Sequence, residues 1–131
     1  MSDGVAIRAL VAGHGDFAAG LVSAVDAITG QGAMLEPIQV KGLCSEDIQQ
    51  LLRERLLATG ALVIFTDLQA GSCTMAARRV LREVAEVALV SGTNLPMLLD
   101  FVMSRGTDPV TAARNAVEKG RSSMSVVGGG A

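Results

Sequence analysis

The chain has 131 residues and a mass of 13.4 kDa, which suits a single domain whose core buries roughly two thirds of the unfolded surface. Its net charge of −2 and sequence pI of about 5.3 are opposite to the basic character that binding to phosphate backbones requires, so nucleic acid is not an expected partner. Hydrophobic residues make up 50%, yet charged residues interrupt every long apolar run. No segment reaches the ~18 apolar residues that cross a bilayer.

Residues 1–4 lack the basic region and the apolar core of a secretory signal, so we expect a cytoplasmic protein whose two cysteines stay reduced. A single histidine and two scattered cysteines form no recognisable cluster of metal ligands. The sequence therefore predicts no metal site, and it indicates no cofactor. Three phenylalanines are the only aromatic residues, which leaves little to stack on a base or to hold the face of a sugar ring.

Apolar periodicity and turn residues predict short strands that alternate with amphipathic helices. In chain order we expect a strand near 5–12, a helix near 17–29, a strand near 34–40, a helix near 45–58, a strand near 61–66, a helix near 73–83, a strand near 86–91, and helices near 95–104 and 109–119. Glycines such as Gly30 and Gly60 fall at the joins, Ser45 is a predicted N-cap, and Asp108 before Pro109 is a strong helix start.

This alternation predicts an α/β three-layer sandwich, with a mainly parallel four-stranded sheet and helices on both faces. For the strand order we expect 2-1-3-4. In such sheets ligands bind outside the carboxyl ends of the strands where the winding direction reverses, here between the first and third strands. His14 follows the first of these strands and Asp67 follows the third. We therefore expect the two side chains at one crevice.

Residues 1–131 are predicted to form one domain that ends in a tail over 121–131. The tail is either a flexible terminus or a place where 124–127 forms an extra edge strand. In the second case the strand pairs with an exposed sheet edge, including one on another subunit.

His14 is the only histidine and lies between two glycines, which allow a sharp turn and leave the imidazole open to a large partner. Transfer of a phosphoryl group needs chiefly an aligned nucleophile and donors for the phosphoryl oxygens, and one neutral ring nitrogen is a sufficient nucleophile. Asp67 would accept from the other ring nitrogen and fix the tautomer. Capping of the next helix is an equally ordinary role for Asp67, and the two roles are compatible.

Gly71 and Ser72 open the third predicted helix, where unpaired N–H groups favour an anion, although Ser72 is equally consistent with a simple helix cap. We expect inert thiols at Cys44 and Cys73. Three further methionines are predicted to fill the core, and three arginines form a basic stripe that is either a solvated helix face or a surface for an acidic partner. These residues are Met75, Met97 and Met103, and Arg78, Arg79 and Arg82.

Three segments together resemble the IIA components of the sugar phosphotransferase system (PTS), mannose family: LVAGHGDFAAGL at 10–21, IFTDLQAGS at 64–72 and SGTNLPML at 91–98. The residues of these segments are most similar to those of members that act on N-acetylgalactosamine, galactosamine or mannose. The resemblance implies a histidine phosphocarrier for sugar uptake. In this family the histidine after the first strand takes a phosphoryl group from the carrier protein HPr and passes it to a IIB component.

Carried over residue by residue, the resemblance makes His14 the phosphorylated residue through Nε2, with Nδ1 facing Asp67. It makes Gly71 and Ser72 the phosphate-binding turn, and it places Asn94 in a loop that lines the site less directly. The chain departs from the family at Ala70, where a second glycine is usual, and at Cys73, where proline is usual.

The resemblance also implies indirect work with the membrane components IIC and IID, and a homodimer that in some relatives exchanges a carboxyl-terminal strand. Two alternatives remain for the function. One is the phosphocarrier subunit of dihydroxyacetone kinase, and the other is a regulatory protein that phosphorylation of His14 switches without onward transfer.

Overall fold

A computed structural model of the protein describes residues 5–130. The residues on which the expectation about a secretory signal depends, 1–4, and the last residue of the tail, Ala131, lie outside the described part. The elements in chain order are β1 Ala9–Ala12, α1 Phe17–Thr29, the short 3-10 helix η1 Gly32–Met34, β2 Leu35–Pro37, α2 Ser45–Thr59, β3 Val63–Thr66, α3 Ser72–Leu81, β4 Ala88–Val90, α4 Leu95–Met103 and α5 Pro109–Ser122.

The four strands form one parallel sheet in the order β2-β1-β3-β4, which confirms the predicted topology. The chain winds outward from β1 to β2 and then returns to the other side of β1 to form β3. The winding direction therefore reverses between β1 and β3, and the carboxyl ends of these two strands define the crevice. Their register pairs Ala12 with Thr66, so both strands end at the same level.

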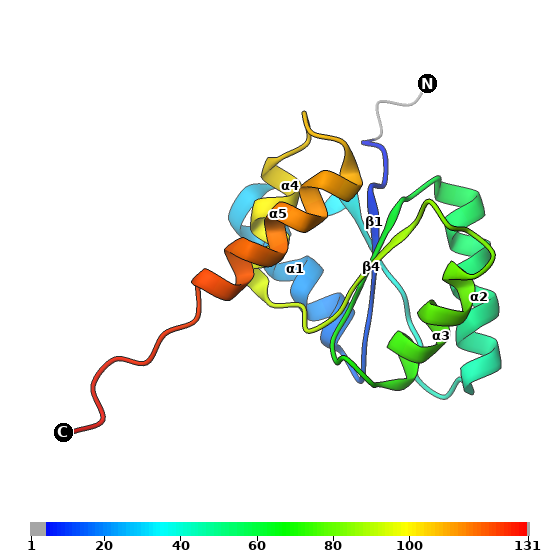
Figure 1. Cartoon of the computed structure of the whole chain (residues 1–131), viewed down its shortest axis with the longest axis horizontal. Helices are drawn as coiled ribbons and strands as arrows, with labels where there is room; N and C mark the ends of the chain where they lie inside the picture. The colour runs from blue at the N-terminus through cyan, green and yellow to red at the C-terminus, as the bar shows by residue number, and fades with distance from the viewer. Residues whose placement is uncertain (1–4, 131) are drawn as a thin grey trace.

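The helices cover both faces of the sheet, with α1, α4 and α5 on one side and α2 and α3 on the other (Figure 1). Successive strand residues point to opposite faces, and the packing follows this alternation. Val11 and Phe65 pack toward α1 and α4, whereas Leu10 and Ile64 pack toward α2 and α3. A parallel sheet buried on both faces requires strands that are apolar throughout, and every residue of β1 and β3 is buried.

The strands are shorter than the apolar runs that predicted them. The run near 5–12 contains only Ala9–Ala12 as strand, and the run near 34–40 contains only Leu35–Pro37, after the turn of η1. Hydrophobicity marks where a segment is buried, but a strand ends where the ladder of hydrogen bonds ends. The helices differ from their predicted ranges by three residues or fewer at either end.

The predicted helix signals are largely confirmed. Gly30 and Gly60 end α1 and α2 in the left-handed region, at φ of +72° and +74°. Asp108 is the N-cap of α5 and accepts from the N–H of Val110. The prediction for Ser45 is wrong by one position, because Cys44 occupies the N-cap and Ser45 is the first helical residue.

The tail leaves the body of the protein after α5 and extends away from it (Figure 1). In the single chain, residues 124–127 form no strand, and Val126 and Val127 are each 94% exposed. Pairing of this segment with another subunit stays a prediction.

Two of the three methionines predicted to fill the core lie at the surface. Met97 is buried, but Met75 is 42% exposed and Met103 is 64% exposed, because each lies on the outer side of its helix.

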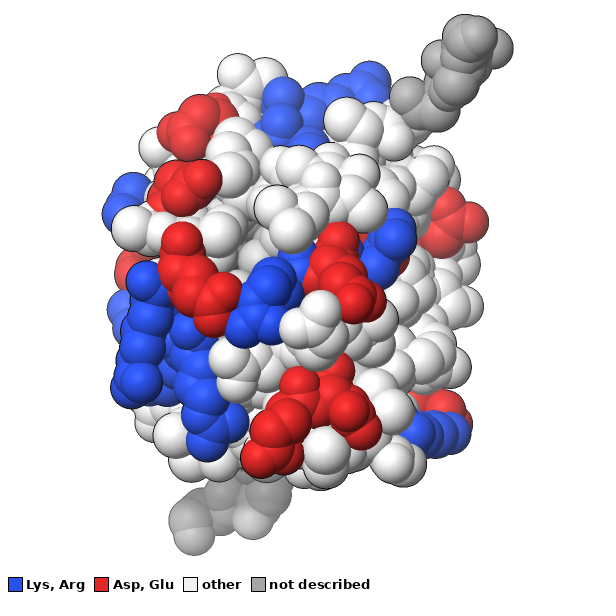
Figure 2. All heavy atoms as spheres, turned by 90° about the vertical axis from the view of Figure 1, so that its right-hand side faces the viewer, with Lys and Arg blue, Asp and Glu red and all other residues white. Residues whose placement is uncertain are grey.

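Figure 2 shows basic side chains gathered in one area of the face covered by α2 and α3. Arg78, Arg79 and Arg82 of the predicted stripe are all exposed. Within residues 5–130, no helix is long and apolar enough to cross a membrane.

Candidate functional site

His14 lies in the turn that follows β1, and its side chain is 59% exposed. The backbone N–H of Phe17 donates to the carbonyl of His14 at 3.0 Å, which closes the turn at the start of α1. Gly15 has a φ of +54°, in the left-handed region where most other residues are strained. The turn therefore presents the imidazole at the carboxyl edge of the sheet, open to a large partner.

Asp67 follows β3 directly, and the structure brings its side chain into contact with His14. The carboxylate oxygen Oδ2 accepts from the backbone N–H of His14 at 2.8 Å and lies 2.8 Å from the ring nitrogen Nδ1. The other oxygen, Oδ1, accepts from the backbone N–H of Leu68 at 2.9 Å. The carboxylate is 10% exposed, so it lies beneath the imidazole and leaves the outer side of the ring free.

These contacts determine the pKa of Asp67. Burial disfavours the charged carboxylate and by itself would raise the pKa. The hydrogen bonds from the backbone and ring of His14, the charge of that ring when protonated, and the N–H of Leu68 all favour the carboxylate and outweigh burial. The pKa of Asp67 therefore lies below its ordinary value, and the group is ionised at neutral pH, where it accepts hydrogen bonds and donates none.

An ionised Asp67 fixes the tautomer of a neutral His14. Since the carboxylate can only accept, the hydrogen of the neutral imidazole lies on Nδ1, and Nε2 keeps a free lone pair. Nε2 has no hydrogen-bond partner within residues 5–130. The arrangement thus offers an exposed, oriented nitrogen nucleophile with a carboxylate behind it that stabilises positive charge on the ring.

Gly71 lies close to the imidazole of His14. Ser72, the next residue in the chain, does not cap α3. A Cβ added to Gly71 would lie 3.0 Å from Cε1 of His14, so the absence of a side chain lets the loop approach the ring. Gly71 is also the N-cap of α3, and no side-chain hydrogen bond caps this helix. Neither Asp67 nor Ser72 has the alternative capping role, and Ser72 is exposed in the first turn of α3.

Two buried threonines that the sequence did not single out hold the loop 67–71. The hydroxyl of Thr74 contacts the carbonyl of Leu68 and lies 2.6 Å from the hydroxyl of Thr66. Both side chains are fully buried. These contacts join the end of β3 to the first turn of α3, so they position Asp67 and Gly71 together. The sequence contained one signal for this role, because Thr74 is a polar residue on the predicted buried face of an amphipathic helix.

Asn94, which the resemblance places in a loop near the site, makes its side-chain hydrogen bonds to α4 and α5. Its Oδ1 accepts from the N–H of Met97 at 3.1 Å, and its Nδ2 donates to the carbonyl of Gly120 at 3.1 Å. The amide therefore caps α4 and ties it to the end of α5. We assign Asn94 a structural role.

The surroundings of Cys73 disfavour its reactive thiolate form. Burial raises its pKa to about 11, and the nearby charge of Asp67 acts in the same direction. Cys44 is exposed before α2. Among residues 5–130, no group of three or more His, Cys, Asp or Glu side chains could hold a metal ion.

The sequence matches the family described as PTS system fructose IIA component over residues 8–118. The match covers most of the chain, and the protein therefore belongs to this family of phosphotransferase system IIA components. Members are phosphocarrier components of the sugar phosphotransferase system and in general work with HPr and IIB components. A comparison with curated proteins gives no significant match.

Solved structures of IIA components have the same fold. The component EIIA from Streptococcus agalactiae superposes with a TM-score of 0.81 at 22% identity, covering 92% of this chain and 96% of that one. The mannose/sorbose specific IIA subunit from Enterococcus faecalis gives 0.78 at 18% identity, with coverage of 95% and 96%. The IIA protein associated with the fucose utilization operon of Streptococcus pneumoniae gives 0.72 at 22%, with 91% of each chain covered.

The close approach at Gly13 yields a test of how tightly the site is packed. A Cβ at this position would lie 2.6 Å from Cδ2 of Phe17 and 2.9 Å from Cγ of Asp67. We expect Gly13→Ala to lower the free energy of unfolding by about 1–3 kcal/mol, because such overpacking forces neighbours apart. Urea unfolding measures the change. Gly20→Ala is the control, since nothing lies within 4 Å of its added Cβ, and an equal loss in both variants would contradict the packing argument.

The two cysteines should differ in reactivity. At pH 8 we expect iodoacetamide to alkylate exposed Cys44 and to leave Cys73 unmodified, because a thiol with a pKa of about 11 contains very little thiolate below that pH. Mass spectrometry of the folded and the urea-unfolded protein measures both sites. Similar rates at the two cysteines in the folded protein would show that Cys73 is neither buried nor protonated as described.

Proposed function

We propose that His14 is the residue that carries the phosphoryl group. It accepts the group from phosphorylated HPr and passes it to a IIB component during sugar uptake. The observation that carries this proposal is the contact between Nδ1 of His14 and Oδ2 of Asp67 at 2.8 Å, which leaves Nε2 exposed. The IIB component would in turn work with the membrane components IIC and IID.

In the proposed step, the lone pair of Nε2 attacks phosphorus, and the bond from phosphorus to the donor breaks. The new bond makes the ring of His14 positively charged while Nδ1 keeps its hydrogen. Asp67 stabilises this charge through the same hydrogen bond that fixed the tautomer, so the carboxylate and the ring need not rearrange during the step. Transfer to the acceptor reverses these changes and restores the neutral ring.

The first turn of α3 is the proposed contact for the phosphoryl oxygens. Gly71 lies against Cε1 of His14, so the start of this helix is next to Nε2. The first N–H groups of a helix have no partner within it, and the helix dipole favours an anion at that end. Ser72 adds an exposed hydroxyl at the same place.

Phosphorylation by phosphoenolpyruvate, enzyme I and HPr tests the assignment. We expect one acid-labile phosphate on each wild-type chain and none on His14→Gln. Asp67→Asn should slow the transfer by about tenfold or more, because a hydrogen bond to a charged group contributes about 1.5–3 kcal/mol. Radiolabelling and mass spectrometry measure extent and rate.

Asp100→Asn is the matched control for the loss of a carboxylate, because Asp100 lies on α4 and its carboxylate makes no hydrogen bond to the imidazole. It should change the rate far less than Asp67→Asn. Since the chain has a single histidine, labelling of His14→Gln at wild-type level would rule out a histidine phosphocarrier. Subsequent loss of the label to a IIB component distinguishes a carrier from a protein that phosphorylation only regulates.

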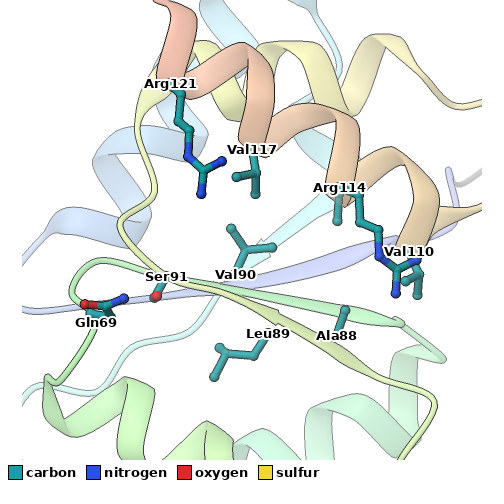
Figure 3. A pocket seen from close by; sticks show the side chains of 10 residues that line it. Gln69, Ala88, Leu89, Val90, Ser91, Val110, Arg114, Val117 and Arg121 are labelled. Carbon is teal, nitrogen blue, oxygen red and sulfur yellow. The ribbon is translucent and has the colours of Figure 1, made fainter. Parts of the chain in front are cut away.

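We also propose that the protein forms a homodimer in which the tail of one copy docks on the other. β4 pairs only with β3, so within residues 5–130 its outer edge has no strand partner. A groove of about 410 Å³ lies along this edge, beneath α5 (Figure 3). Arg114, Val117 and Arg121 extend from α5 toward β4 across the groove, and Gln69 lies at its end.

The tail has the properties of a strand that such a groove would accept. Met124, Val126 and Val127 are 68%, 94% and 94% exposed, and an isolated chain gains nothing from keeping them in water. Addition of this segment to β4 would bury these side chains and pair the free backbone groups of the edge.

Truncation tests the dimer. Deletion of residues 124–131 should convert a dimer into a monomer in analytical ultracentrifugation while the helical signal in the circular dichroism spectrum stays unchanged, because residues 124–130 contribute no helix. Deletion of residues 128–131 is the control and should leave the dimer intact, since it retains the aliphatic residues. A wild-type protein that stays monomeric at micromolar concentrations would contradict the proposal.

A further inference from the structure

The loops at the carboxyl edge of the sheet contain only one basic residue, Lys41. These loops are 13–16, 38–44, 67–71 and 91–94, and each follows one of the four strands at the edge where His14 lies. Acidic groups are more frequent at this edge. Asp16 and Asp67 lie in the loops, and Glu46 and Asp47 lie in the first turn of α2. A phosphoryl group on His14 would therefore add charge to an edge that is already negative.

Lys41 is held beside the turn that carries His14. Its ammonium nitrogen lies 2.6 Å from Oδ1 of Asp16, which is two residues after His14 in the chain. This ion pair connects the loop after β2 with the loop after β1. Side chains of Lys41 and Asp16 are 58% and 78% exposed, so water screens their attraction and the pair contributes little to stability. Lys41 can therefore leave Asp16 for another anion with only a small loss of free energy.

We propose that Lys41 exchanges Asp16 for the phosphoryl group when His14 is phosphorylated. The proposal rests on the function proposed for His14. A phosphoryl group carries about two negative charges near pH 7, so it attracts an ammonium group more strongly than a single carboxylate does. The lysine side chain has four flexible methylene groups and three donor hydrogens, which allow it to turn from one anion to another. In this role Lys41 is a binding residue of the phosphorylated state, and Asp16 is the residue that holds it in the free state.

The exchange has two consequences for the chemistry of the site. Lys41 would stabilise the dianionic form of the phosphoryl group and thereby lower its second pKa. It would also release Asp16, so phosphorylation would change the charge pattern of the surface that partner proteins contact. Lys41 would then both bind the phosphoryl group and cause the change in surface charge that a partner protein can recognise.

Phosphohistidine prepared chemically tests the proposal without HPr. Treatment of the full chain with phosphoramidate phosphorylates histidine directly, and His14 is the only one. Titration by ³¹P NMR then gives the second pKa of the phosphoryl group. We expect Lys41→Gln to raise this pKa relative to wild type, and Lys41→Arg to restore most of it, because a cation lowers the pKa of a nearby anion.

The second lysine of the chain provides a matched control. Lys119 is exposed on α5, and Lys119→Gln removes the same charge from the chain as Lys41→Gln. It should leave the phosphoryl pKa unchanged. In exchange with phosphorylated HPr, Lys41→Gln should shift the equilibrium away from this protein by about three- to tenfold, and Lys119→Gln should not.

Asp16→Asn should act in the opposite direction to Lys41→Gln. It frees Lys41 and lowers the phosphoryl pKa, and in the Lys41→Gln background this decrease should become smaller. Equal phosphoryl pKa values in wild type, Lys41→Gln and Lys119→Gln would overturn the proposal. Failure of HPr to label the wild-type chain would instead overturn the proposed function, while the measurement on chemically phosphorylated protein would still decide the role of Lys41.

Discussion

The site depends on one carboxylate oxygen that serves two parts of the same residue. Oδ2 of Asp67 accepts from the backbone N–H of His14 and also lies against its ring nitrogen Nδ1, each at 2.8 Å. The first contact fixes where the turn after β1 leaves the sheet, and the second fixes the rotation of the ring. Because β1 and β3 are neighbours in register, the carboxylate reaches both groups without any irregular backbone between them. The reversal of winding between these strands is thus what makes the pair possible.

This arrangement requires space at two positions, and glycine provides it. A side chain at Gly13 would collide with Asp67 and Phe17, and one at Gly71 would press against the ring of His14. The loop that holds Asp67 and Gly71 is in turn fixed by the buried hydroxyl groups of Thr66 and Thr74. The imidazole of His14 is therefore oriented by the packed residues beneath it, and it needs no contacts on its exposed side.

The parallel sheet and, for the order 2-1-3-4, the pairing of His14 with Asp67 could be predicted from the sequence because both follow from general rules. Alternating apolar runs specify a parallel sheet, and polar residues after the first and third strands must then meet at one edge. Thr74 was missed because its role depends on a hydroxyl turning inward from a helix. The capping role of Asn94 was not foreseen because one of its partners, the carbonyl of Gly120, belongs to a helix that is distant in the sequence. Met75 and Met103 were predicted to be buried because methionine is hydrophobic, but residue type alone does not indicate which side of a helix a residue occupies.

A phosphocarrier must release what it binds, and the charges around His14 suit that requirement under the proposed function. A site built to retain a phosphoryl group would surround it with cations, and its tight binding would slow transfer to the next protein. In the proposed step Asp67 would stabilise the ring rather than the phosphoryl oxygens, and the carboxyl edge of the sheet contains one lysine among several carboxylates. Positive charge on the ring would therefore be favoured, while Lys41 would be the only cationic side chain of the loops at this edge that is available to the phosphoryl group. Such a balance would keep the proposed bond from Nε2 to phosphorus easy to form and easy to break, and a carrier that transfers the group from one protein to the next needs both.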